Sequence, residues 1–202
     1  MVATNHHVTN VRQRAAVYAL LARLWGRELS AELLAELQQD ELRKAYETAG
    51  GFVPQDSTDE VLDQLTMDYC QLFLGPSGHL PPYQSVWSEG RFEGVTTTSL
   101  REYVEILNDA GNWSATNPLD HLSIQLDMMA YILNAQAETS DDVAANREAA
   151  HHLAMHFFHD HIGWAIPLCQ AAQGRSESEF YRQLSKMTGN FIEDGRTRLD
   201  SA

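Results

Sequence analysis

The apolar residues of this 202-residue chain recur with the period of an α-helix in almost every segment that contains them. In the first such segment one broad face carries Val11, Ala15, Tyr18, Leu21, Leu24 and Trp25. No segment alternates between apolar and polar residues as a strand does, and no internal repeat is present. A chain of this length can bury one sizeable core. The sequence therefore predicts an all-α fold, a single-domain helical bundle over residues 1–202 with about nine or ten helices.

Capping residues and helix breakers predict where these helices begin and end. Starts are expected at Asn10, Ser30, Thr58, Thr98 or Ser99, Asn117, Asp141 and near Ser176, which are residue types that favour the N-cap. The helix after Thr58 must end near Gly75–Pro76, because proline cannot continue the backbone ladder. The helix that follows Thr98 or Ser99 is expected to end at Gly111 in the left-handed conformation.

A Gly/Pro-rich segment over residues 75–95 separates two groups of predicted helices. We expect it to be a loop, and a loop of this length inside a compact domain is often functional. It contains Tyr83, Trp87 and Phe92, which must either pack onto the body or serve a ligand. It is also a possible hinge, so the chain is expected to be a monomer or a domain-swapped dimer.

The formal net charge of −14 bounds the partners of the chain. Such a surface repels nucleic-acid phosphates and anionic lipid and attracts cationic partners, although solubility alone also explains it. No apolar run is long enough to span a membrane. Residues 1–10 have neither Lys, Arg nor an apolar core, so they do not resemble a secretory signal. With Cys70 and Cys169 expected as buried free thiols, a cytoplasmic location is predicted.

A histidine-rich stretch over residues 151–161 is the first candidate for chemistry. His152 and His156 are four residues apart, as helical metal ligands often are. The zinc-protease pattern is absent, because no Glu directly follows the first His. His159–Asp160 is similar to helical metal-dependent phosphohydrolases, for which His121 and Asp194 could supply further ligands at arbitrary spacing. That enzyme is the alternative function; otherwise these histidines are ordinary core, cap and surface residues.

Asp120 and His121 are the second candidate, in the expected first turn of the helix that Asn117–Pro118 would open. An acidic residue there is favoured by the helix dipole, which alone could explain Asp120. The pair could equally hydrogen-bond a peptide backbone or a guanidinium group. Catalytic motifs for nucleophilic chemistry are missing, and we expect no catalytic residue, metal or cofactor.

Five short segments, in order, resemble one family. They are Tyr69-Cys70-Gln71-Leu72-Phe73 followed by Gly75-Pro76, Pro82-Tyr83-Gln84-Ser85-Val86-Trp87, Asn117-Pro118-Leu119-Asp120-His121, His161-Ile162-Gly163-Trp164 and Phe180-Tyr181-Arg182-Gln183-Leu184. Together they span about residues 65–192 and are similar to the TorD/DmsD family of cytoplasmic redox-enzyme maturation chaperones, within the NarJ/TorD/DmsD superfamily. Asn117 departs from the usual Glu or Gln, and Tyr83 replaces a Trp of some relatives.

This resemblance implies a non-enzymatic chaperone. Its partner would be the twin-arginine signal peptide of a precursor of a molybdopterin-dependent reductase, of the dimethyl sulfoxide or trimethylamine N-oxide type. The chaperone would assist cofactor insertion and delay export by the Tat pathway. The expected peptide-binding residues are Tyr69, Leu72, Phe73, Pro82, Tyr83, Trp87, Pro118, Asp120 and His121. Asp120 is the expected arginine contact, and the apolar residues could instead be core.

Overall fold

The computed structural model describes residues 2–115, 118–138 and 144–199. Within these ranges it contains ten α-helices, a 3-10 turn, a π-helical turn and no strand, which confirms the all-α prediction. None of the helices in the described ranges is both long and apolar enough to traverse a lipid bilayer. The chain divides into two compact units. Unit 1 is formed mainly by Met1–Gly26 and Tyr83–Gly163, and unit 2 by Arg27–Pro82 and Trp164–Arg198.

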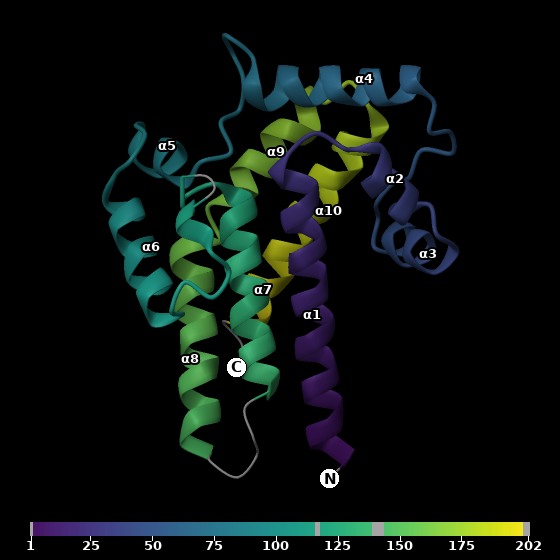
Figure 1. The fold of residues 1–202 in the computed structure, drawn as a ribbon. Helices are drawn as coiled ribbons and strands as arrows, with labels where there is room; N and C mark the ends of the chain where they lie inside the picture. The colour runs from purple at the N-terminus through teal and green to yellow at the C-terminus, as the bar shows by residue number, and fades with distance from the viewer. Residues whose placement is uncertain (1, 116–117, 139–143, 200–202) are drawn as a thin grey trace. The chain divides into compact units, whose positions relative to one another are not determined.

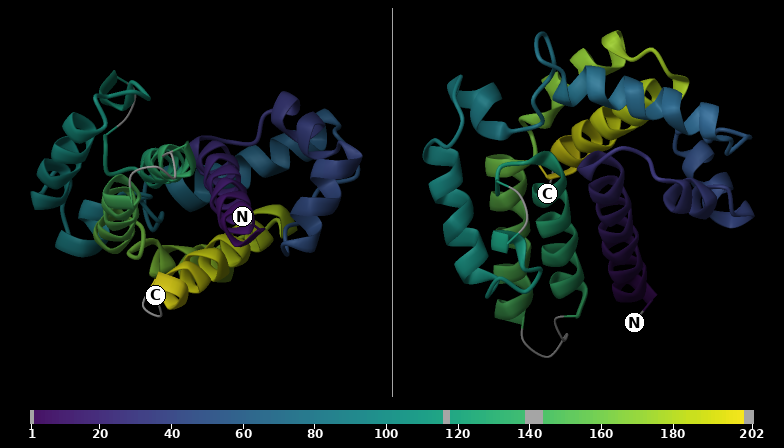
Figure 2. Two further views of the ribbon diagram at one scale, coloured as in Figure 1. Left: turned by 90° about the horizontal axis from the view of Figure 1, so that it is seen from below. Right: turned by 45° about the horizontal axis from the view of Figure 1, so that its top comes forward.

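The body of unit 1 is a layer of three long helices. They are α1 (Val2–Gly26), α7 (Leu122–Glu138) and α8 (Ala144–His161). α7 packs against both of the others and lies between them in Figures 1 and 2. Accordingly, its predicted apolar positions are all buried: Leu122, Leu126, Met129, Ile132 and Leu133. The shorter elements of this unit are α5 (Gln84–Glu89), α6 (Val95–Ile106) and the 3-10 turn η2 (Trp113–Ala115).

Unit 2 contains the remaining helices. They are α2 (Ala31–Leu37), α3 (Asp40–Thr48), α4 (Asp59–Tyr69) with the π-helical turn η1 (Cys70–Leu74), α9 (Ala165–Arg175) and α10 (Glu179–Leu199). Asp68 of α4 accepts hydrogen bonds from the backbone N–H of Glu177 and of Ser178, at 3.1 and 2.9 Å, and so anchors the start of α10. Cys169 of α9 is buried, which raises the pKa of its thiol, whereas Cys70 is half-buried.

Two predicted helix starts are confirmed in unit 2. Ser30 and Thr58 are N-cap residues, and their hydroxyls accept from the N–H of Leu33 at 3.3 Å and of Val61 at 3.4 Å. The helical run after Thr58 ends at Leu74, directly before Gly75–Pro76, as expected. Local sequence was sufficient to predict these two helix starts, because in each of them the donor and the acceptor lie three residues apart.

Three predicted boundaries are wrong. α1 begins at Val2 rather than after Asn10. The segment over residues 75–95 is not all loop, because it contains α5, which ends at Gly90 with a φ of 71°. α6 begins at Val95, one turn before Thr98, because the carboxylate of Glu89 accepts the N–H of Val95 at 3.1 Å and of Thr96 at 3.0 Å. A side chain of the preceding helix thus supplies the cap.

Two further boundaries differ around α7. The left-handed residues after α6 are Asn108, Asp109 and Asn112, with φ of 53°, 46° and 52°, and not Gly111. α7 begins at Leu122, so Asp120 precedes the helix instead of lying in its first turn. Asn117 and Asp141, the expected caps of α7 and α8, lie outside the described residues.

Candidate functional site

The nine residues expected to bind peptide belong to both units. Unit 2 holds Tyr69, Leu72, Phe73 and Pro82, and unit 1 holds Tyr83, Trp87, Pro118, Asp120 and His121.

The aromatic residues of the first segment form a buried cluster inside unit 2. The ring centroids of Tyr69 and Phe73 are 5.0 Å apart, and those of Tyr69 and Tyr181 are 5.7 Å apart. Leu72 is buried beside them, and its carbonyl accepts the N–H of Leu80 at 2.6 Å. These side chains stabilise the core of unit 2, since buried aromatic pairs add to the free energy of burial. Their contact with a peptide stays a prediction.

In unit 1, the Pro-rich segment meets the segment that precedes α7. Tyr83 and His121 form an isolated antiparallel bridge, and their ring centroids lie 5.1 Å apart. The N–H of Gln84 also donates to the carbonyl of Asp120 at 2.9 Å. Phe92, which is 58% exposed, also packs against the ring of Tyr83, with the two centroids 5.1 Å apart. The structure therefore brings together Tyr83, Asp120 and His121, which are distant in sequence.

Asp120 is buried, with an exposed fraction of 1%. Its Oδ2 accepts the backbone N–H of Ser85 at 3.2 Å and also the hydroxyl of Ser85. Within the described residues its Oδ1 has no hydrogen-bond partner. The negative charge of Asp120, together with burial, raises the pKa of Tyr83; burial is the larger cause. Asp120 thus joins the start of α5 to the start of α7.

His121 caps α7. Its Nδ1 accepts the N–H of Ser123 at 3.1 Å, and its carbonyl accepts the N–H of Ile124 and of Gln125. An Nδ1 that accepts requires the hydrogen on Nε2, so the ring is neutral. Burial lowers the pKa of His121 to about 4, and the charge of Asp120 opposes this only in part. Nε2–H makes no hydrogen bond within the described residues and can donate to a ligand.

Gln84 occupies the centre of a buried polar network that the sequence analysis missed. Its Oε1 accepts from Nδ1 of His161 at 3.0 Å and from the side-chain amide of Gln125. Its Nε2 donates to the carbonyl of Asp160 at 2.6 Å. Ser99 of α6 completes the network by its contact with Nε2 of His161 at 3.1 Å. The sequence did contain a signal for this network, because Gln84 and His161 lie inside two of the family-like segments.

His161 is therefore a structural residue of unit 1. It is 2% exposed, and this burial lowers its pKa to about 4 despite the nearby charge of Asp160. The hydroxyl of Tyr103 donates to Oδ2 of Asp160 at 3.0 Å, and burial, followed by this bond, raises the pKa of Tyr103. These contacts tie α5 and α6 to the end of α8.

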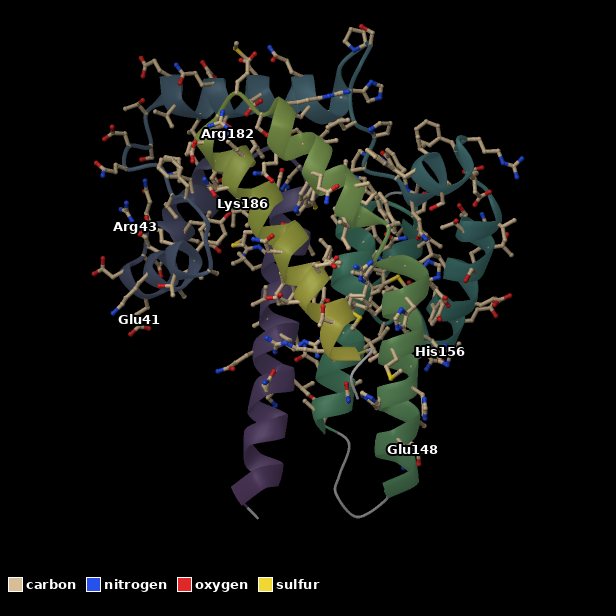
Figure 3. The ribbon with its side chains drawn as sticks, turned by 180° about the vertical axis from the view of Figure 1, so that it is seen from behind. Glu41, Arg43, Glu148, His156, Arg182 and Lys186 are labelled. Atoms are coloured by element: carbon tan, nitrogen blue, oxygen red, sulfur yellow. The ribbon has the colours of Figure 1, made fainter. Side chains whose placement is uncertain are left out.

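The histidine-rich stretch does not assemble a metal centre among the described residues, where no three His, Cys, Asp or Glu side chains lie close enough together to hold an ion. Figure 3 shows Glu148 and His156 on the outer side of α8, and both are exposed. His161, by contrast, points into unit 1. No observation on the described residues favours the metal-dependent phosphohydrolase.

Comparisons with known proteins point to one family. The sequence pattern of the family described as "Nitrate reductase delta subunit" matches residues 27–170. The chain is 24% identical to "Chaperone protein TorD" of Photobacterium profundum, over 84% of this chain and 86% of that protein. It is 26% identical to "Chaperone protein TorD" of Vibrio vulnificus (strain YJ016), over 87% and 89%. It is also 26% identical to "Chaperone protein YcdY" of Escherichia coli (strain K12), over 65% and 62%.

The family pattern covers the first four of the five segments on which the resemblance was based, and it ends before Phe180. The predicted class, a redox-enzyme maturation chaperone without enzymatic activity, is thereby confirmed at the level of the family. The chain belongs to the nitrate reductase delta subunit family, among its TorD-like chaperones.

Proposed function

We propose that this chain is a cytoplasmic chaperone that binds the twin-arginine signal peptide of a molybdopterin-dependent reductase precursor. The client would be of the dimethyl sulfoxide or trimethylamine N-oxide reductase type. The chaperone would hold the precursor while its cofactor is inserted and would delay its export by the Tat pathway. It would act as a monomer or as a domain-swapped dimer and would catalyse no covalent step.

The observation that carries this proposal is the meeting of two family-like segments in unit 1. Tyr83 and His121 form a bridge with their rings in contact. Tyr83 is only half-buried, so its aromatic face can contact an apolar side chain of a peptide. Nε2–H of His121 can donate to a peptide carbonyl. An extended segment recognised in this way would gain both apolar and backbone contacts.

The negative net charge of the chain suits a peptide that carries a basic segment. A twin-arginine signal presents two guanidinium groups, followed by an apolar stretch. A protein with a formal net charge of −14 attracts such a peptide and increases its rate of encounter. Guanidinium groups also prefer carboxylates that can accept two hydrogen bonds.

Asp120 takes a particular place in this proposal. Its Oδ1 lacks a partner within the described residues, and so it could accept from a guanidinium group. Because Asp120 is 1% exposed, an arginine reaches it only if the segment of Tyr83 and Ser85 moves aside. The contact predicted for Asp120 therefore requires a rearrangement on binding, as is common in regulatory interactions.

The direct test is titration of the purified chain with a synthetic twin-arginine signal peptide, monitored by calorimetry. The matched control is the same peptide with both arginines replaced by lysine, which keeps the charge but loses the planar fork. We expect the lysine peptide to bind about tenfold more weakly. Equal affinities for both peptides would show only charge attraction and would contradict the proposal.

The client can be tested in cells. A tagged copy of the chain, expressed in its own host, should capture a reductase precursor that still carries its signal peptide. Deleting the signal peptide from that precursor should abolish the capture. Capture of the mature reductase alone, with no dependence on the signal peptide, would assign the chaperone to another surface of its client.

A further inference from the structure

A cleft of about 390 Å³ lies in unit 1 beside the segment that precedes α7. One wall is the face of α6 that carries Thr97, Arg101, Val104 and Glu105. The other wall is Pro118–Leu119, which directly precedes Asp120. A volume in this range, about 300 to 1,000 Å³, is typical of ligand sites, so the cleft has room for a long side chain.

The charges in the cleft are arranged for a cation. Glu93, two residues before α6, and Glu105, near the end of α6, both line the cleft, and Arg101 lines it one helical turn before Glu105. Within the described part of the chain none of these three side chains makes an ion pair. Two carboxylates against one guanidinium leave one net negative charge in the cleft.

A polar group without a partner is also present in the wall. Thr97 is 6% exposed, and its hydroxyl has no hydrogen-bond partner within the described residues. Buried hydroxyls usually have a hydrogen-bond partner, so this one is able to bond with a ligand group in the cleft. The apolar lining next to it, Val104 and Leu119, suits the aliphatic stem of a long cationic side chain.

We propose that this cleft binds one arginine of the twin-arginine motif, with its guanidinium group paired to the carboxylate of Glu105 and with Glu93 adding negative charge to the same cleft. The inference rests on the proposed function and names where it is carried out. It also solves a difficulty of access, because Asp120 is covered whereas Glu93 and Glu105 are exposed. The arginine would thus bind at the accessible side of the segment that ends in Asp120, and Val104 and Leu119 would contact its stem.

Replacing Arg101 should change the affinity for the peptide in a direction that can be tested. Its charge lies within the cleft and opposes an incoming guanidinium. Removing this charge should strengthen binding, whereas removing that of Glu105, one turn away, should weaken it. A surface that merely attracts cations would respond equally to the loss of any carboxylate on α6, so the comparison of Glu105 with Glu102 distinguishes a site from such a surface.

The experiment measures the anisotropy of a dye-labelled twin-arginine peptide with the full chain and its variants. The test variants are Glu93→Gln, Glu105→Gln, the double variant and Arg101→Gln. The matched control is Glu102→Gln, which makes the same change of charge at an exposed position of α6 outside the cleft. A thermal melt of each variant checks that it folds.

We expect the double variant to bind about tenfold more weakly, Glu102→Gln within about twofold of the unchanged chain, and Arg101→Gln several-fold more tightly. With a peptide whose arginines are replaced by alanine, the loss caused by Glu105→Gln should disappear, because the pair is then already broken.

Two results would overturn the inference and leave the proposed function standing. One is full affinity of the double variant, and the other is an equal loss in Glu102→Gln and Glu105→Gln, which indicates steering alone. Failure of the unchanged chain to bind the twin-arginine peptide would instead contradict the proposed function itself.

Discussion

Ser85 donates both its backbone N–H and its hydroxyl to the same oxygen, Oδ2 of Asp120. The two residues are 35 positions apart in sequence, and both are buried. Their contact holds the first turn of α5 against the segment that leads into α7. A residue that the sequence marks as a ligand contact is therefore also a structural support of unit 1.

Asp120→Ala should lower the free energy of unfolding by about 2–3 kcal/mol, because it leaves both donors of Ser85 buried without an acceptor. Denaturation by urea, followed by tryptophan fluorescence, measures this. Ser85→Ala removes only the hydroxyl donor and should cost less. If Asp120→Ala had the same free energy of unfolding as the unchanged chain, the hydrogen bonds to Ser85 would not contribute to stability. Asp120 would then have no structural role.

Stability should fall as the pH decreases from 7 to 5. The pKa values of His121 and His161 are about 4 in the folded chain, below the ordinary value of 6.5. The unfolded chain therefore binds more protons in this window, and each histidine costs about 2 kcal/mol of stability between pH 7 and pH 5. Urea denaturation at both pH values measures the slope. His161→Gln should make it shallower, and an unchanged slope in that variant would contradict the assignment.

Gln84→Glu should raise the pKa of His161. The new carboxylate would lie 3.0 Å from Nδ1 of His161, where Oε1 of Gln84 lies now, and a negative charge favours the protonated ring. Titration of the ring by NMR measures this pKa directly. The matched control is Ser88→Glu, which adds the same charge at an exposed position of α5. A pKa that stays about 4 in Gln84→Glu would exclude the contact.

Asp68→Ala should destabilise unit 2 by about 2 kcal/mol, since Asp68 accepts the N–H of Glu177 and of Ser178 and acts as a distant cap for α10. Denaturation by urea measures the loss. Asp63→Ala, at an exposed position of the same helix, is the control and should change stability by less than about 0.5 kcal/mol. Similar losses in both variants would mean that only the charge of α4 matters.

Added salt should slow the association of the twin-arginine peptide and leave its dissociation nearly unchanged. The reason is that the net charge of −14 acts over several ångströms of solvent before contact, and salt screens it. Stopped-flow kinetics at about 0.05 and 0.5 M NaCl would measure both rates. An association rate that does not depend on salt would show that the acidic surface plays no part in the encounter.

Local sequence determined the class of fold and many of its details. The helical period of the apolar residues predicted an all-α chain because this period depends only on neighbours three and four positions apart. The caps at Ser30 and Thr58 were predicted for the same reason. The family also followed from the sequence, because the order of short segments is a property of the chain itself.

Tertiary structure decided what those segments do. Gln84 contacts His161 across 77 positions, and no local pattern indicates which of several histidines will be its partner. The cap of α6 comes from Glu89, which belongs to another helix. Asp120 was predicted to lie in the first turn of a helix, but it is a buried residue that precedes α7. Such contacts depend on which helices pack together, and burial then removes the water that would otherwise satisfy these polar groups.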